Sequence, residues 1–428
     1  MNILVLGSGG RESAFIKKII ESPQTEALYA APGNAGTALW AENIPLDIEN
    51  FASIKDFAIK KQIGMILVGP ELPLVKGIHD YFLADSTMRD IKIIGPCKSG
   101  ARLEGSKSFA KDFMKRAGIP TAAYQSFKSD QIESARVFLR TLKPPYVLKA
   151  DGLASGKGVL IAENLQQAEE ALEEMLLQKK FGSASETLVI EEFLQGIEFS
   201  VFVLTDGKNY KILPSAKDYK KIGEKDQGLN TGGMGAVSPV PFVEDALMRK
   251  VEEKIIIPTL SQLQKEKIPY SGFLFIGLMK VGDEPYVIEY NVRMGDPETE
   301  VVLPRIESDF VELLSSVAPK KLDEIKLKIK SEFAVCVMLA SGGYPEKYKT
   351  NYPIEIGADI AAETYLFHAG SFVDELGTMR TNAGRVIAVT TLDPDLRTAI
   401  KKTYTQVDKV KFKDRYFRGD IGKDLLCI

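Results

Sequence analysis

Short apolar runs alternate with amphipathic stretches along the first hundred or so residues of the chain. The apolar runs predict strands at 2–6, 27–31, 65–68 and 91–94. The amphipathic stretches predict helices at 12–21, 51–61 and 75–83. Strands that alternate with helices in this way are typical of a doubly wound parallel sheet, so we predict an α/β fold for this region.

From residue 107 onward the pattern changes. A helix is predicted at 107–117, and strands at 146–149, 158–162 and 187–191 surround a helix at 165–178. The unit at about 122–191 has roughly seventy residues, which are few for an independent core and favour a lid over a free domain. Strands of antiparallel character follow at 199–205, 210–213, 272–281 and 286–291, with a helix at 246–265. A charged stretch at 320–330 precedes a last unit with strands at 333–339 and 385–390.

We therefore predict an α/β and α+β multidomain protein with clefts between its units. The predicted units are an N-terminal doubly wound domain at 1–103, a bridging helix at 104–121, a lid at 122–192, a body at 193–328 and a small C-terminal α/β domain at 329–428.

The overall charge gives no general attraction for polyanions. The 428 residues include 55 Lys and Arg against 58 Asp and Glu, so we expect neither nucleic acid nor a membrane surface as a partner. No apolar run approaches the roughly 18 residues of a membrane span. Cys97, Cys336 and Cys427 lie far apart and outside any Cys-x-x-Cys spacing, which favours a reducing compartment and hence the cytoplasm. With only two histidines, the chemistry is expected to rest on carboxylates, lysines, arginines and glycine-rich loops.

A glycine-rich turn, Gly7-Ser8-Gly9-Gly10-Arg11-Glu12, joins the first predicted strand to the first helix. Backbone N–H groups converge there, and Arg11 adds a guanidinium suited to phosphate. A dinucleotide site is disfavoured because Glu12 stands where the third Gly of G-x-G-x-x-G would lie. A phosphate site is our first interpretation, and a tight structural turn is our second. Loops at 32–37 and 69–71 follow two other strands, and ligands of parallel sheets collect at such strand ends.

Two more glycine-rich segments are candidates for ligand contact. The segment 149–159 reads Lys-Ala-Asp-Gly-Leu-Ala-Ser-Gly-Lys-Gly-Val, so its backbone can fold over a ligand while its lysines face phosphate oxygens. It is not a P-loop, because Gly158 stands where Ser or Thr is required, and a flexible hairpin is the alternative. The polar segment 223–236 is long for a connection, and we interpret it as a substrate loop.

A metal site is predicted on the strand at 286–291. Alternation places Val287, Glu289 and Asn291 on one face of this strand, and Arg293 continues that face. A carboxylate and an amide oxygen are hard ligands suited to Mg²⁺, which keeps other positions for water and phosphate.

Together these segments resemble the ATP-grasp ligases, and among them the glycinamide ribonucleotide synthetase (phosphoribosylamine–glycine ligase) family. The motifs that carry the resemblance run in family order over essentially the whole chain: Gly9-Gly10-Arg11-Glu12, Pro32-Gly33-Asn34-Ala35-Gly36-Thr37, Val68-Gly69-Pro70-Glu71, Leu103-Glu104-Gly105-Ser106-Lys107, residues 149–159, residues 230–236 and Gly295-Asp296-Pro297-Glu298-Thr299.

The resemblance implies an ATP-grasp lid and body and a ligase of de novo purine biosynthesis. Glycine would be joined to 5-phosphoribosylamine through a glycyl phosphate, giving glycinamide ribonucleotide, ADP and phosphate. The cofactors would be ATP and Mg²⁺ or Mn²⁺. We expect a monomer.

The resemblance also implies roles for individual residues. Those expected to bind ATP are Lys107, Lys149, Gly152, Ser155, Gly156, Lys157, Gly158, Glu191, Phe193, Leu194 and Glu198. Those expected to bind the substrates are Gly9, Gly10, Arg11, Glu12, Asn34, Ala35, Gly36, Thr37, Glu71, Asn230, Thr231, Gly232, Gly233 and Gly235. Those expected to act in catalysis are Arg293, Lys149 and Asp296, and the metal ligands would be Glu289 and Asn291.

The chain departs from the family pattern at a few positions. Ser13 and Tyr219 stand where the family usually has His, and Leu229 replaces a frequent Pro, which affects fine substrate contacts more than the reaction. The strand at 273–281 lacks a carboxylate that many ATP-grasp enzymes have, so the protein offers the metal a single charge. Two alternatives are another ATP-grasp carboxylate–amine ligase and a non-catalytic nucleotide-binding regulator. The presence of Lys107, Lys149, Glu289 and Asn291 argues against the regulator.

Overall fold

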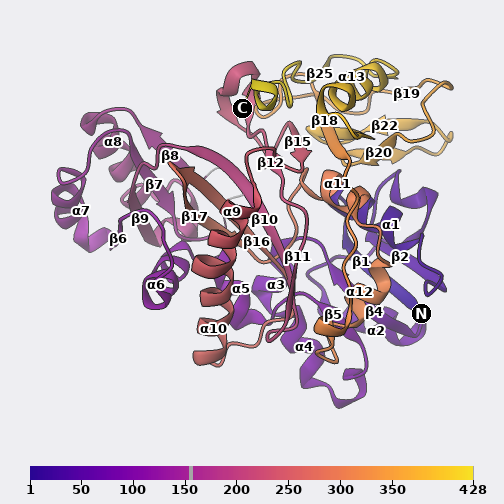
Figure 1. Ribbon diagram of the computed structural model, residues 1–428, viewed down its shortest axis with the longest axis horizontal. Helices are drawn as coiled ribbons and strands as arrows, with labels where there is room; N and C mark the ends of the chain where they lie inside the picture. Colours follow the sequence, from indigo (N-terminus) through magenta and orange to yellow (C-terminus); the bar gives the residue numbers. More distant parts are fainter. Residues whose placement is uncertain (154–157, 428) are drawn as a thin grey trace.

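The computed structural model describes residues 1–153 and 158–427. Its N-terminal part is a sheet in the order β3–β2–β1–β4–β5, with parallel pairing throughout, which confirms the predicted doubly wound sheet (Figure 1). The strands are β1 (Asn2–Gly7), β2 (Ala27–Pro32), β3 (Glu42–Asn43), β4 (Ile63–Val68) and β5 (Lys92–Ile94). The helices are α1 (Gly10–Ile19), α2 (Phe51–Lys60), α3 (Glu71–Lys76), α4 (Ile78–Ala84) and α5 (Lys98–Gly105).

The single helix predicted at 75–83 is wrong. The chain forms α3 and α4 instead, and Gly77 between them has a φ of +91°, a left-handed conformation that ends one helix before the next begins.

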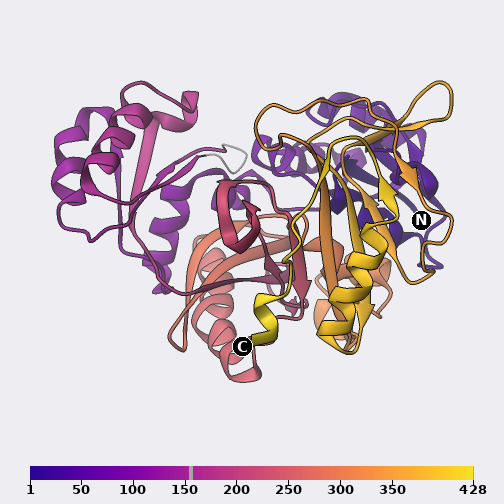
Figure 2. The same ribbon diagram turned by 90° about the horizontal axis from the view of Figure 1, so that it is seen from above.

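Helix α6 (Lys107–Ala117) leads into the lid, which lies at one end of the molecule (Figure 2). Its antiparallel sheet has the order β6–β9–β7–β8. The elements are β6 (Tyr124–Lys128), α7 (Ile132–Leu139), β7 (Tyr146–Ala150), β8 (Val159–Ala162), α8 (Leu165–Leu176) and β9 (Thr187–Glu192). The lid buries an apolar cluster of its own, which includes Leu148 and Leu172. Strand β6 was not predicted because only Phe127 of its five residues is buried, so it lacks an alternating pattern.

The body is an antiparallel sheet in the order β11–β10–β16–β17. Its strands are β10 (Ile197–Thr205), β11 (Tyr210–Ile212), β16 (Gly272–Val281) and β17 (Glu284–Asn291). The helix predicted at 246–265 is present as α9 (Asp245–Val251), a π-helical turn (Glu252–Ile256) and α10 (Ile257–Lys265). The π turn ends two residues before Pro258, whose ring cannot fit a regular α-helical interior.

A β-bulge interrupts the pairing of β16 with β17. Glu289 pairs with Gly277 and Val287 pairs with Leu278, so Ile288 is an extra residue between them. The bulge turns Val287 into the apolar core, whereas Glu289 and Asn291 share the other face. The prediction that Val287 shares a face with Glu289 is therefore wrong.

The C-terminal sheet has the order β12–β15–β18–β23–β20 and lies with the N-terminal sheet, away from the lid (Figures 1 and 2). Its strands are β12 (Lys217–Asp218), β15 (Gly235–Ser238), β18 (Phe333–Ser341), β20 (Tyr365–His368) and β23 (Arg385–Asp393), and β25 (Arg415–Tyr416) pairs with β18. Strands β12 and β15 precede residue 329, so this sheet includes segments from both sides of that predicted boundary. Three short pairs complete the strands: β13 (Lys221–Gly223) with β14 (Gln227–Asn230), β19 (Glu355–Ile356) with β24 (Val410–Lys411), and β21 (Ser371–Val373) with β22 (Met379–Thr381).

The remaining helices are α11 (Thr299–Val302), α12 (Phe310–Ser315) and α13 (Leu396–Val407). The segment 223–236, interpreted above as a substrate loop, contains the hairpin β13–β14 and the start of strand β15. Within the described ranges, no helix is both long enough and apolar enough to cross a membrane.

Candidate active site

A buried carboxylate lies between two lysines where the lid meets the body. Glu191 ends the buried part of β9, and the Nζ of Lys149 on β7 lies 3.0 Å from its Oε1. The Nζ of Lys111 on α6 lies 2.8 Å from Oε2 of Glu191, the oxygen to which Lys149 Nζ also donates at 3.0 Å. Lys111 Nζ donates to Thr121 Oγ1 at 2.8 Å as well. Burial and the charge of Lys149 lower the pKa of Lys111 to about 8, although Glu191 opposes this shift. Two lysines on one carboxylate leave a surplus positive charge, which suits a phosphate.

The glycine-rich segment 149–159 is called the flap below. Its described part is anchored to the first turn of α6. The Asp151 carboxylate accepts a hydrogen bond from Ser108 N at 2.6 Å, and the Nζ of Lys107 donates to Gly152 O at 3.4 Å. The flap base is therefore fixed beside the lysine that is expected to contact ATP. Of the other predicted flap residues, Gly158 is buried, and Ser155, Gly156 and Lys157 lie outside the described ranges.

The segment that joins the lid to the body, residues 193–198, brings Glu198 next to a lysine that was not predicted as a site residue. Phe193 is exposed and Leu194 is half-buried. The Nζ of Lys220 lies 3.1 Å from Glu198 Oε2, and the charges of Asp218 and Glu198 raise the pKa of Lys220. In this structure the carboxylate expected to contact ribose is paired with Lys220.

The predicted metal ligands occupy the end of β17 beyond the bulge. Burial alone would raise the pKa of Glu289, but Lys220, Lys149 and Lys107 together hold it below the ordinary value, so the carboxylate stays charged. Asn291 is buried and its Nδ2 has no hydrogen-bond partner in the structure. No group of three or more His, Cys, Asp or Glu side chains is placed to hold a metal among the described residues. One carboxylate and one amide fit Mg²⁺ when phosphate oxygens supply further positions.

Arg293 is held at the same strand end by two carboxylates. Its Nη2 lies 2.8 Å from Glu104 Oε1, and its Nε lies 3.5 Å from Glu71 Oε2. Glu104 also accepts from Val292 N at 2.7 Å, which fixes the strand that carries Arg293. Burial raises the pKa of Glu104, whereas Arg293 and Arg11 lower that of Glu71 against the effect of burial. Glu71 thus contacts the predicted catalytic arginine in this structure.

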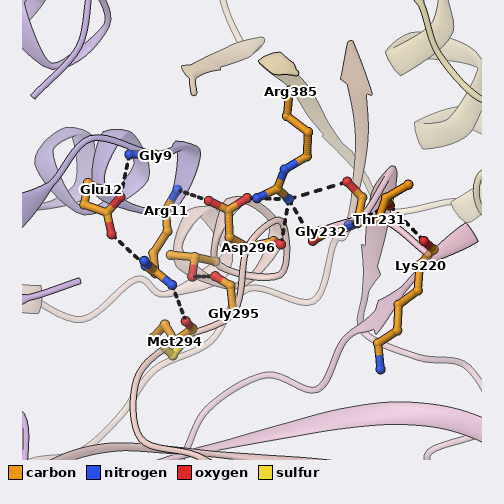
Figure 3. Close-up of polar contacts among 12 residues, drawn as sticks. Gly9, Arg11, Glu12, Lys220, Thr231, Gly232, Met294, Gly295, Asp296 and Arg385 are labelled. Atoms are coloured by element: carbon orange, nitrogen blue, oxygen red, sulfur yellow. Dashed lines mark hydrogen bonds and ion pairs between the residues drawn. The ribbon is translucent and has the colours of Figure 1, made fainter. Parts of the chain in front are cut away.

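The glycine-rich turn before α1 holds a carboxylate of the protein itself. Gly9 N donates to Glu12 Oε2 at 2.6 Å, and Arg11 Nε donates to Glu12 Oε1 at 2.7 Å (Figure 3). A Cβ on Gly69 would lie 2.0 Å from Glu12 Oε1, and one on Gly7 would lie 2.5 Å from Glu12 Cδ. These glycines therefore make room for Glu12. The N–H of Gly9, which we expected to face a phosphate, is already paired.

The loop after β2 is internally bonded. The Nδ2 of Asn34 donates to Ser8 O at 2.8 Å and to His368 O at 2.7 Å. Its Oδ1 accepts from Gly36 N at 2.8 Å and from Thr37 N at 3.0 Å, and Ala35 is buried. The Asn34 side chain therefore ties the N-terminal turn to the C-terminal part of the chain.

Asp296 joins segments that are far apart in the sequence (Figure 3). Its Oδ2 accepts from Arg11 N at 3.2 Å, and its Oδ1 lies 2.8 Å from Arg385 Nη1. The charges of Arg385 and Arg11 hold the pKa of Asp296 below its usual range, although burial opposes this. Thr231 Oγ1 donates to Lys220 O at 2.8 Å, which links the adjacent glycine-rich segment to the connection between β12 and β13. The remaining predicted members of that segment are the exposed Asn230 and Gly232 and the buried Gly233 and Gly235.

Four charged residues of this site were not predicted from the sequence as site residues: Glu104, Lys111, Lys220 and Arg385. Glu104 and Lys220 stand inside or beside recognised motifs, which offered a signal for them. Lys111 and Arg385 stand alone on a helix and a strand, and only the tertiary fold brings them to the site.

Models of known protein families match almost the whole chain. The sequence model of the phosphoribosylglycinamide synthetase N domain matches residues 1–104, that of the ATP-grasp (A) domain residues 105–299, and that of the C domain residues 334–424.

Individual relatives agree with these matches. The chain is 41% identical over 423 residues to the phosphoribosylamine–glycine ligase of Caldanaerobacter subterraneus, with 99% of each chain covered. It is 43% identical over 426 residues to that of Vibrio vulnificus, with 99% of this chain and 98% of the relative covered. It is also 42% identical to the bifunctional purine biosynthetic protein PUR2,5 of Pichia angusta, of which it spans 53%.

Solved structures of similar fold agree with the sequence matches. The phosphoribosylamine–glycine ligase of Thermotoga maritima superposes with a TM-score of 0.85 at 33% identity, covering 98% of this chain and all of that one. The biotin carboxylase of Campylobacter jejuni superposes with a TM-score of 0.73 at 17% identity, covering 99% and 93% of the two chains, which shows a shared fold.

Proposed function

This chain belongs to the phosphoribosylglycinamide synthetase family, and from that premise we propose how its residues carry out the family reaction. It is an ATP-grasp carbon–nitrogen ligase that joins glycine to 5-phosphoribosylamine in purine biosynthesis. We place the reaction in the cytoplasm, which fits the three free cysteines.

The proposed reaction has two steps. A glycine carboxylate oxygen attacks the γ-phosphorus of ATP, the bond to the bridging oxygen breaks, and ADP and glycyl phosphate form. The amine nitrogen of phosphoribosylamine then attacks the glycyl carbonyl carbon, phosphate leaves, and the amine loses a proton to give the amide. Both steps depend on positioning and charge neutralisation more than on a nucleophilic side chain.

On the nucleotide side, Lys149 and Lys107 bind the ATP phosphates and the flap at 149–159 covers them. The lid supports this assignment because Lys149 is buried at the flap's first residue and Lys107 contacts the flap backbone at Gly152. Glu191 with Phe193 and Leu194 forms the adenine edge, and Glu198 takes the ribose hydroxyls once Lys220 releases it.

The metal would be held by Glu289 and Asn291, whose oxygens share one face of β17. When bound, Mg²⁺ or Mn²⁺ neutralises charge on the ATP phosphates. Arg293, held by Glu104 and Glu71, is placed at the same strand end to steady the transferred phosphoryl group.

On the acceptor side, the substrates lie between the N-terminal turn, the segment at 230–235 and Asp296. Arg11 supports this assignment, because its backbone N–H bonds to Asp296 and its side chain bonds to Met294 O at 3.2 Å. Gly9, Gly10 and Glu12 shape the turn, and residues 34–37 hold it to the C-terminal part.

The observation that carries the proposal is the convergence at the end of β17. A charged carboxylate, Glu289, stands there within the electrostatic influence of three lysines, and a guanidinium, Arg293, follows four residues later. The lysines and the guanidinium neutralise charge on a phosphoryl group in transfer, and the carboxylate would hold the metal.

The test is ADP release measured with ATP and Mg²⁺ while each substrate is omitted in turn. We expect full release only when glycine and phosphoribosylamine are both present, with glycinamide ribonucleotide formed in equal amount. Release that is independent of glycine or of phosphoribosylamine would overturn the proposal. Release driven by another carboxylate or amine identifies a different ATP-grasp ligase, and no release with any pair identifies a nucleotide-binding regulator.

A further inference from the structure

Arg385 reaches from the C-terminal sheet into the acceptor region. It begins β23, and its Nη1 donates to the carbonyl oxygens of Gly232 and Asp296, both at 2.8 Å (Figure 3). The same nitrogen lies 3.5 Å from Gly233 O. One guanidinium thus fixes the backbone of the glycine-rich segment against the backbone of Asp296.

The glycine-rich segment fits closely against this guanidinium. A Cβ on Gly232 would lie 2.9 Å from Arg385 Cζ, and one on Gly233 would lie 2.4 Å from Pro297 Cδ. Gly233 also has a φ of +115°, which disfavours a larger residue. The segment can therefore contact Arg385 and Pro297 only because it lacks side chains at these two positions.

The same contacts leave one oxygen of Asp296 available. Both hydrogens of Arg385 Nη1 are used by main-chain carbonyls, so Asp296 Oδ1 has an ion-pair contact at 2.8 Å but no hydrogen-bond donor among the described residues. The second oxygen accepts from Arg11 N. Asp296 is thus oriented from both sides, with one buried acceptor free.

We propose that Arg385 is a positioning residue of the acceptor site: it orients Asp296 so that Oδ1 accepts a hydrogen bond from the amine of phosphoribosylamine. The inference rests on the proposed function, because it names the substrate group that Asp296 contacts. Arg385 itself acts through Asp296 and through the Gly232–Gly233 backbone. The C-terminal part of the chain then contributes to acceptor binding.

The test compares Arg385→Met and Arg385→Lys with the natural enzyme in steady-state assays, with phosphoribosylamine formed from ribose 5-phosphate and ammonia. Arg385→Met should raise the KM for phosphoribosylamine roughly tenfold to a hundredfold, since hydrogen bonds to a charged group are lost. The KM for ATP should stay within about twofold, and Arg385→Lys should lie between the two. Asp296→Asn combined with Arg385→Met should cost little more than either change alone, because the two residues act as a unit.

The matched control is Arg380→Met, which removes an arginine of strand β22 whose Nε pairs with Asp374 at 2.5 Å, outside the acceptor site. This variant should keep the KM for every substrate. An unchanged KM for phosphoribosylamine in Arg385→Met, or an equal rise in KM for all three substrates, would overturn the inference. If Arg385→Met fails to fold, the same comparison is decided with Arg385→Lys. Failure of the natural enzyme to need phosphoribosylamine would instead overturn the proposed function.

Discussion

Lys111 shares a buried carboxylate with Lys149, so its removal tests how the lid accommodates ATP. In Lys111→Met the side chain keeps an unbranched apolar stem and loses its charge. Without nucleotide, Glu191 retains Lys149 at 3.0 Å, so no buried charge is left unpaired. The free energy of unfolding should therefore fall by less than about 2 kcal/mol, as for an ordinary single substitution.

ATP changes this balance, because we propose that Lys149 moves from Glu191 to the phosphates. In the natural protein Lys111, 2.8 Å from the carboxylate, then neutralises Glu191 alone. In Lys111→Met the carboxylate, which is only 3% exposed, is left unpaired. An uncompensated buried charge costs about 3–5 kcal/mol, so ATP affinity should fall at least about a hundredfold.

The assay is calorimetric titration of each variant with a non-hydrolysable ATP analogue and Mg²⁺. Lys115→Met, an exposed lysine on the same helix, is the control and should bind like the natural protein. Adding Glu191→Gln to Lys111→Met removes the unpaired charge and should recover most of the affinity. Binding by Lys111→Met within about twofold of the natural protein would refute the idea that Lys149 leaves Glu191.

Three further predictions concern the metal, the arginine that we propose acts in catalysis, and pH. Glu289→Ala should lose most turnover at saturating Mg²⁺ while its circular dichroism spectrum is retained; unchanged turnover would remove Glu289 from the site. Glu104→Gln should lower kcat roughly tenfold to a hundredfold with little change in the KM for ATP, because Arg293 loses its closest charged partner, and an unchanged kcat would contradict this. Burial lowers the pKa of His368 from 6.5 to about 4, so the unfolded state takes up a proton first as pH falls. Stability to urea should drop by about 2 kcal/mol more between about pH 7.5 and about pH 5 than in His368→Asn, and equal drops would contradict the assignment.

Local sequence patterns predicted many of the elements but not their irregularities. Alternation located β17 and placed Glu289 and Asn291 together, because both lie beyond the bulge. It misplaced Val287, because the extra residue at Ile288 depends on how β16 pairs with β17. The glycines of the N-terminal turn also led to a prediction that was only partly right. They predicted a phosphate site, but the anionic group at the turn in this structure is the Glu12 carboxylate of the same motif.

Isolated charges were beyond prediction for a different reason. Lys111 and Arg385 carry no local motif, and Glu104 stands in a motif that does not indicate its partner. The partners of all three are many residues away in the chain. Strands β12 and β15 join the C-terminal sheet from within the predicted body, and this crossing brings Arg385 to the segment at 230–235. Such contacts are decided by how the units pack, which single-sequence periodicity does not encode.

The departures from the family pattern lie at contacts between segments. The buried Ser13 accepts a hydrogen bond from His368 N at 3.2 Å. The buried Tyr219 donates from its hydroxyl to Asp424 at 2.5 Å and accepts from Gly422 N at 3.0 Å. The neighbouring Lys220 instead pairs with Glu198 of the body. The hydroxyls that replace the two family histidines therefore bond to the C-terminal part of the chain, and the charged groups that face the site are those of the neighbouring residues.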